Sequence, residues 1–229
     1  MRAQIRIGLV GNGRMGQAIA RALASQEDLE LAGMAGREDD LDALAQAADV
    51  LIDFSLPEAT AGVLASAAMH HKPLVCGVSG LSASHMSAIA KAAERIPVVY
   101  DRNMSQGIGV LDEVLRQAAP ALGPGYSIRI EETHHKHKKD APSGTALKLG
   151  ETLARALAID PGEIRYHSER RGEVPGEHTV IFSSANEVLT FSHSVSTRDV
   201  FALGALRAAR WAAQRAPGQY SMHDVLFNP

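Results

Sequence analysis

The chain has 229 residues, enough for one large domain or two small ones, and its 45% hydrophobic and 21% charged residues are typical of a globular protein. A formal net charge of -3 excludes a chain built as a whole to bind polyanions, so we expect no nucleic-acid partner. No apolar run is long enough to span a bilayer, no signal-peptide pattern is visible, and the single cysteine, Cys76, cannot form an internal disulfide. We therefore expect a cytoplasmic protein with no membrane partner.

The first half of the chain alternates between strand and helix patterns. Apolar runs predict five strands, at 5–10, 29–35, 50–54, 73–78 and 97–100. Residues at helical spacing predict helices at 15–23, 41–48 and 82–95, and a further helix that has Ser55 as its N-cap and Pro57 in its first turn. This alternation is typical of an α/β fold, a Rossmann-type parallel sheet with helices on both faces.

The pattern changes near Asn103. We expect a helix at 107–119, a strand at 126–132 and a helix at 145–158. Three extended runs follow, at 164–168, 178–184 and 188–194, and they predict an antiparallel meander. The last predicted helix, at 199–215, is expected to pack back on the first domain. The sequence therefore predicts an N-terminal domain at 1–105, completed by 199–229, and a smaller α+β domain at 106–198.

A glycine-rich turn joins the first predicted strand to the first helix. Its spacing is G-x-G-x-x-G, formed by Gly11, Asn12, Gly13, Arg14, Met15 and Gly16. The first glycine permits a tight turn, the second lets a pyrophosphate approach the backbone, and the third allows close packing of helix on strand. The helix N-terminus then faces the phosphates. The turn predicts a nicotinamide dinucleotide site; the alternative is a glycine-rich turn without a ligand.

Other loops should contact the same dinucleotide. Arg37 follows the second strand, where it can hold a 2′-phosphate of the adenosine ribose, and Glu38 beside it can accept from a 2′-hydroxyl. The alternative is a solvated charge pair. Ligands of open α/β sheets bind outside the carboxyl ends of the strands. The loops after the fourth and fifth strands are therefore expected to contact the nicotinamide half, through Gly77, Val78, Ser79, Asp101, Arg102, Asn103 and Met104.

Three histidines and three lysines occupy positions 134–139. Such a cluster favours anionic ligands and offers proton donors near neutral pH. Directly after it, Ser143, Gly144 and Thr145 begin a helix whose N–H groups and hydroxyls suit a carboxylate or phosphate. The stretch predicts a site for a small dianionic substrate. A metal site, a solvated loop and a nucleic-acid contact are the alternatives, but no clear acidic or cysteine partner set is present, and we expect no metal.

At these residues the chain resembles the 4-hydroxy-tetrahydrodipicolinate reductases, also called dihydrodipicolinate reductases, of lysine and diaminopimelate biosynthesis. The strongest match is His134 to Lys138 followed by the run from Asp140 to Ala146, D-A-P-S-G-T-A. Further similar segments lie at 13–16, 52–55, 57–60, 103–105, 171–172, 176–178, 201–205 and 220–226. The turn at Gly11 is one residue shorter than the commoner family turn.

The resemblance implies reduction of 4-hydroxy-tetrahydrodipicolinate to tetrahydrodipicolinate with NADH or NADPH. It implies that His134 is the acid/base residue and Lys138 the proton donor, and that the substrate's carboxylates contact His135, Gly144 and Thr145. From the helix start we expect Ser143 to bind a carboxylate as well. It further implies that 106–198 bind the substrate and join a homotetramer. Two alternatives stay open, another NAD(P)-dependent dehydrogenase of this fold and a non-catalytic NAD(H)-sensing protein. The sensing protein needs the glycine turn but not the His/Lys–Ser–Gly–Thr stretch.

Overall fold

The computed structural model describes residues 4–228, and the chain folds into two compact units. Unit 1 holds the chain up to Gln106 and again from Asp199 onward, and unit 2 holds Gly107–Arg198. The first boundary falls one residue after the predicted one, and the second coincides with it. Each unit has a hydrophobic core of its own, as expected of a domain.

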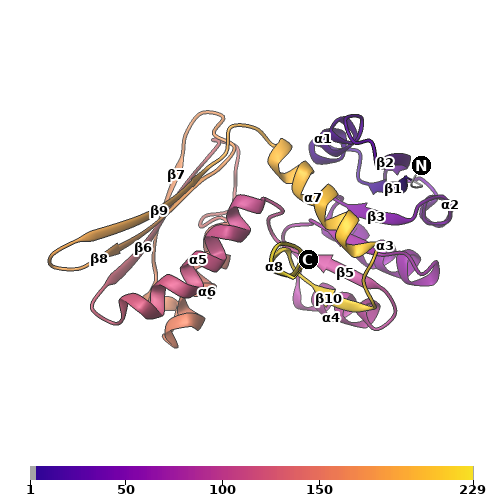
Figure 1. Ribbon diagram of the computed structural model, residues 1–229. Helices are drawn as coiled ribbons and strands as arrows, with labels where there is room; N and C mark the ends of the chain where they lie inside the picture. Colours follow the sequence, from indigo (N-terminus) through magenta and orange to yellow (C-terminus); the bar gives the residue numbers. More distant parts are fainter. Residues whose placement is uncertain (1–3, 229) are drawn as a thin grey trace. The chain divides into compact units, whose positions relative to one another are not determined.

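Unit 1 is built on a six-stranded sheet in which every neighbouring pair is parallel (Figure 1). In spatial order its strands are β10 (Gly218–Tyr220), β5 (Pro97–Tyr100), β4 (Leu74–Cys76), β3 (Val50–Asp53), β1 (Ile5–Val10) and β2 (Leu29–Ala35). The predicted Rossmann-type parallel sheet is confirmed. The strand order reverses between β1 and β3, and ligands of such sheets bind at the carboxyl ends of the strands next to this point.

The helices of unit 1 cover both faces of the sheet. One core includes residues of α1 (Arg14–Leu23), α7 (Asp199–Ala212) and α8 (Met222–Phe227). A second includes residues of α2 (Leu41–Ala47), α3 (Pro57–Met69) and α4 (Ala83–Ala93). Successive side chains of a strand point to opposite faces, so Leu9 lies in the first core and Val10 in the second. None of the helices within residues 4–228 is both long and apolar enough to cross a membrane.

Unit 2 has a four-stranded mixed sheet that packs on two helices. Its spatial order is β7 (Arg165–Arg170), β6 (Ser127–His134), β8 (Glu177–Ser183) and β9 (Val188–Ser194). The core between the sheet and its helices includes residues of α5 (Gln106–Leu122) and α6 (Gly144–Leu157), and a short 3-10 helix, η1 (Pro161–Glu163), precedes β7. Every second side chain of β6 is buried, which places Glu132 and His134 on the same face as the core residues Ile128 and Ile130.

The predicted antiparallel meander is wrong for its first strand. β7 pairs in parallel with β6, and only β8 and β9 form an antiparallel hairpin. The reason is that α6 carries the chain back after β6, so β7 enters the sheet in the same direction as β6. β6 also continues past the predicted end at Glu132 as far as His134, which brings His134 opposite Arg170 of β7.

Two details of unit 1 also differ from the prediction. Ser55 is not the N-cap of α3, because Leu56 occupies that position and the N–H of Ser55 donates to Oδ1 of Asp53 at 2.9 Å. β10 and α8 are absent from the prediction. A strand as short as β10 shows no sequence period, and it depends on its pairing with β5.

Candidate active site

Two glycines shape the turn between β1 and α1. Gly11 has a φ of +99°, and a Cβ there would lie 2.7 Å from the carbonyl oxygen of Phe54. A Cβ on Gly16 would lie 1.9 Å from the carbonyl oxygen of Gly11, so only glycine permits this packing. By contrast, nothing lies within 4 Å of the Cβ position of Gly13. Because α1 also lacks a side-chain N-cap, a phosphate can approach its first N–H groups.

A cavity of about 870 Å³ opens beside this turn. Four of the predicted cofactor residues line it together with Phe54 and Ser55, namely Gly11, Asn12, Gly13 and Arg37. The N–H of Gly11 donates to the carbonyl of Ala35 at 2.8 Å, which holds the end of β2 against the turn. Arg14, Met15 and Gly16 follow as the first residues of α1. These residues fit a dinucleotide, with phosphates at the helix start and the adenosine ribose near the end of β2.

The other predicted cofactor residues follow β4 and β5, which are neighbours in the sheet. Ser79 and Arg102 are exposed, Gly77 and Asn103 are half-buried, and Val78 is buried. Two of the residues support the loop itself. Asp101 accepts from the N–H groups of Asn103 and Met222, at 3.2 and 3.3 Å, and the side chain of Met104 is 1% exposed within the core. Met104 therefore offers a ligand only its backbone.

The histidine and lysine cluster separates into two groups. His134, the last residue of β6, is buried, and the Nζ atom of Lys138 is held by Oδ1 of Asp140 at 2.8 Å. The side chains of Lys136 and His137 are 63% and 69% exposed and lie near Glu173, and Lys139 is exposed as well. His135 is half-buried. Of the six residues, His134 and Lys138, the two to which the resemblance assigns proton transfer, are thus more enclosed than Lys136, His137 and Lys139.

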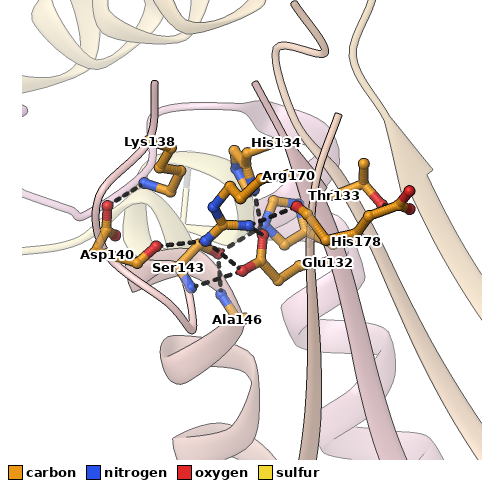
Figure 2. A network of polar contacts seen from close by, with 10 residues as sticks. Glu132, Thr133, His134, Lys138, Asp140, Ser143, Ala146, Arg170 and His178 are labelled. Carbon is orange, nitrogen blue, oxygen red and sulfur yellow. Dashed lines mark hydrogen bonds and ion pairs between the residues drawn. The ribbon is translucent and has the colours of Figure 1, made fainter. Parts of the chain in front are cut away.

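A buried carboxylate holds His134 in place (Figure 2). Nδ1 of His134 is hydrogen bonded to Oε2 of Glu132, whose side chain is fully buried. The guanidinium of Arg170 donates to both oxygens of Glu132, at 2.9 and 3.0 Å. The N–H of Ser143 donates to the Oε1 atom at 3.2 Å. Glu132 and Arg170 were not predicted as site residues; the signal in the sequence is a glutamate at an inward-facing strand position, which requires a cationic partner.

Ser143 begins the helix that the sequence predicts to bind an anion. Its Oγ accepts from the N–H of Ala146 at 3.1 Å and lies 3.1 Å from Nε2 of His178 on β8. Thr145 is buried, whereas a Cβ on Gly144 would meet nothing within 4 Å. The helix start is therefore approachable at Gly144. His178 was not predicted as a site residue either.

The electrostatics of the site depend on burial and on one ion pair. Burial alone would raise the pKa of Glu132, but hydrogen bonds, first of all from Arg170, hold it below its ordinary value. Burial lowers the pKa of His134, and the neighbouring carboxylate opposes this effect without cancelling it. The ring of His178 lies edge-on to that of His134, with centroids 5.1 Å apart. Burial, with the charges of His134 and His193, lowers the pKa of His178 to about 3, so His178 is neutral near pH 7.

The described residues contain no cluster of side chains suited to bind a metal ion. Among residues 4–228, no group of three or more His, Cys, Asp or Glu residues is arranged to hold a metal ion. The arrangement instead offers an imidazole, an ammonium group and a helix start, which together suit proton transfer to an anionic substrate.

Known proteins are similar to this chain in sequence. Two profiles of one family cover nearly the whole chain: dihydrodipicolinate reductase, N-terminus, matches 5–104, and dihydrodipicolinate reductase, C-terminus, matches 107–226. The 4-hydroxy-tetrahydrodipicolinate reductases of Zymomonas mobilis and Chromohalobacter salexigens are 42% and 40% identical to the chain. The alignments cover 98% and 96% of this chain and 98% of each relative.

Solved structures share the fold. A dipicolinate-bound dihydrodipicolinate reductase from Paenisporosarcina sp. TG-14 has a TM-score of 0.81 at 20% identity, covering 95% of this chain and 97% of its own. A probable dehydrogenase from Thermotoga maritima has a TM-score of 0.65 at 13% identity, covering 97% and 92%.

Proposed function

The chain belongs to the dihydrodipicolinate reductase family, and we propose that it reduces 4-hydroxy-tetrahydrodipicolinate to tetrahydrodipicolinate with NADH or NADPH, in lysine and diaminopimelate biosynthesis. In this reaction the cyclic substrate gains a hydride and loses its hydroxyl group as water. The departing hydroxyl needs a proton, and the two carboxylates need cationic or N–H partners. The protein has to supply both.

Unit 1 supplies the cofactor site, and the bound cofactor supplies the hydride. The residues around the phosphates are Gly11, Asn12, Gly13, Arg14, Met15 and Gly16. Arg37 is assigned to the adenosine ribose, because it lines the cavity at the end of β2. Gly77, Val78, Ser79, Asp101, Arg102, Asn103 and Met104 are assigned to the nicotinamide half, from their position after two neighbouring strands.

Unit 2 supplies the groups for the substrate. Ser143, Gly144 and Thr145 hold one carboxylate at the start of α6, where backbone N–H groups and the helix dipole favour an anion. His135 contacts a carboxylate from the preceding loop. His134 gives and takes protons at Nε2, and Lys138 donates a proton from Nζ.

One observation carries this proposal. His134 and Lys138 lie in the same unit as the approachable start of α6, and Glu132 binds both His134 and Ser143. A non-catalytic NAD(H)-sensing protein would need the glycine turn alone. A dehydrogenase with a monoanionic or neutral substrate would have no use for cationic and N–H groups on both sides of its ligand.

We also propose that the enzyme is cytoplasmic and forms a homotetramer through unit 2. α5 and α6 pack on one face of the unit 2 sheet, while β9 exposes the apolar side chains of Val188 and Leu189, at 65% and 38%. An edge strand has unpaired backbone groups that can pair with another chain, and the exposed apolar side chains of β9 would be covered by such a contact.

The test is an assay with freshly generated substrate, followed through the absorbance of NADH or NADPH. We expect cofactor oxidation that depends on the substrate and that pyridine-2,6-dicarboxylate inhibits competitively. Tight cofactor binding without substrate-dependent oxidation would support the sensing protein instead. Oxidation that the dicarboxylate does not inhibit would contradict the proposed carboxylate site.

A further inference from the structure

Glu132, which is fully buried, and Arg170, which is partly buried, form an ion pair beside the proposed proton-transfer residue. Besides its two bonds to Glu132, Arg170 donates to the backbone carbonyl of Asp140, and its side chain is 20% exposed (Figure 2). Burying such a pair rarely adds stability over apolar residues of similar volume. Its position in the site therefore points to a role other than stability.

The Glu132 carboxylate joins two parts of the site. Its Oε2 atom is bound by Nδ1 of His134 at the end of β6, and its Oε1 atom accepts from the N–H of Ser143 at the start of α6. Arg170 binds both oxygens, so the carboxylate cannot rotate without losing several bonds. Through Asp140, Arg170 also fixes the loop that connects the two parts.

We propose that Glu132, held by Arg170, is a positioning residue that fixes the ring of His134 and its distance from the carboxylate-binding start of α6. This inference rests on the proposed function, because it takes from it the roles of His134 and Ser143.

The first consequence concerns the tautomer of His134. An ionised carboxylate can only accept hydrogen bonds, so Nδ1 of His134 keeps its proton in both charge states of the ring. Nε2 is then the atom that gains and loses the proton. This atom faces Gly176, where a Cβ would lie only 3.2 Å away, so any larger residue would crowd it. A carboxylate orients the histidine of a serine protease triad by the same logic.

The second consequence concerns the charge of His134. The groups that face its ring are Glu132 on β6, Arg170 on β7, His178 on β8 and Lys138 in the loop after β6. Burial, and then Lys138 and Arg170, lower the pKa of His134, whereas Glu132 raises it. Without the carboxylate, the pKa of His134 should therefore fall further.

The variant Glu132→Gln tests both consequences through the pH dependence of kcat. We expect kcat to fall about 10²-fold, the lower end of the contribution of a general acid–base group. One limb of the pH profile reports the titration of His134 and is identified by its absence in His134→Gln. In Glu132→Gln this limb should move to lower pH by about one unit or more. An unmoved limb in folded Glu132→Gln protein would overturn the proposal, because a merely structural residue changes stability and not this limb.

Glu131→Gln is the matched control. Glu131 is the next residue of β6, its side chain is 38% exposed and it pairs with Arg129, so the substitution removes the same charge on the other face of the strand. We expect the wild-type pH profile. A shift equal to that of Glu132→Gln would overturn the proposal by showing a general charge effect.

A measurement on the wild-type chain covers the case in which Glu132→Gln does not fold. With ring-¹⁵N histidine, the nitrogen signals that disappear in His134→Gln belong to His134. We expect the neutral ring to carry its proton on Nδ1, and a proton on Nε2 would overturn the proposal. This measurement needs no substrate, so it tests the role of Glu132 even if the wild-type chain shows no reductase activity. A failed reductase assay would count against the proposed function alone.

Discussion

At the residue scale, the proposed proton transfer depends on His134. Its ring is buried and hydrogen bonded at Nδ1, so Nε2 is the nitrogen left for the substrate. We predict that His134→Gln lowers kcat by about 10²- to 10⁴-fold, the range of a general acid–base group. The cofactor site belongs to unit 1, so the Kd for NADH, from fluorescence titration, should stay at the wild-type value.

His137→Gln is the control for this substitution. His137 lies in the same cluster, but its side chain is 69% exposed and its neighbour is Glu173. We expect this variant to keep wild-type kcat. A His134→Gln variant with near-normal kcat would remove His134 from the mechanism.

At the residue scale, we expect the choice between NADH and NADPH to depend on the end of β2. Arg37 lines the cavity beside the glycine turn and brings permanent charge and paired donors, which suit a 2′-phosphate. Two carboxylates stand nearby in sequence: Glu38 is exposed, and Asp39 accepts from the N–H of Gly36 at 2.7 Å. They oppose a phosphate, so we expect both cofactors to bind with only a modest preference.

We predict that Arg37→Ala weakens NADPH binding and leaves NADH binding nearly unchanged. Fluorescence titration of both cofactors at two salt concentrations is the measurement, and NADPH should show the steeper salt dependence. Glu38→Gln is the companion variant and should strengthen NADPH binding. Equal losses for both cofactors in Arg37→Ala would mean that Arg37 supports the loop and does not bind the phosphate.

At the element scale, the sequence predicts unit 1 better than unit 2. The central strands β3, β4 and β5 are mostly apolar because parallel strands inside a sheet are buried on both faces, and the glycine turn lies directly between β1 and α1. The strands of unit 2 are half-buried, and sequence patterning does not reveal which strand pairs with which. The parallel entry of β7 depends on α6 crossing over, and this was predicted wrongly.

The same limit applies to the site. The stretch from His134 to Ser143 is recognisable as a candidate site because its histidines, lysines and helix start lie close together in the sequence, and the resemblance assigns the roles of His134 and Lys138. Glu132 meets Arg170 and His178 only through the strand order β7-β6-β8, in which Glu132 pairs with His178 and His134 with Arg170. The expected meander pairs β7 with β8, whereas β7 lies next to β6. The contact of Arg170 with Glu132 could therefore not be predicted.

His178 on β8 should make the free energy of unfolding depend on pH. His178 is 3% exposed, and burial first of all lowers its pKa to about 3, against about 6.5 for an unfolded histidine. Between these values the unfolded chain binds more protons than the folded chain, so stability falls as the pH decreases through this window. The loss from one such residue is at most about 1.4 kcal/mol for each pH unit.

We predict that His178→Gln reduces the fall in Tm between about pH 7 and about pH 5, because glutamine does not titrate and can still hydrogen bond to Ser143. The fall should shrink and not vanish, since burial also lowers the pKa of His134 and His193. His167→Gln is the control, because His167 on β7 is exposed. An unchanged pH dependence in His178→Gln would show that His178 is not the group that titrates.

At the scale of the whole molecule, the proposed cofactor-binding and substrate-binding residues belong to different units. The glycine turn, Arg37 and the loops after β4 and β5 all lie in unit 1, and His134, Lys138 and the start of α6 all lie in unit 2. Substitutions in one unit should therefore change the binding of one ligand and leave the other unaffected. The unit 2 sheet carries a further feature, its exposed apolar edge.

We predict that Val188→Asp disrupts the proposed homotetramer. Val188 begins β9 and is 65% exposed, with Leu189 beside it, and a carboxylate placed in an apolar interface would lose its hydration without gaining a partner. Light scattering on a size-exclusion column should give a tetramer mass for the wild-type chain and a smaller mass for the variant. Leu203→Asp on α7 of unit 1, at an apolar side chain 44% exposed, is the control and should leave the mass unchanged. A tetramer that survives Val188→Asp but dissociates in Leu203→Asp would place the interface on unit 1.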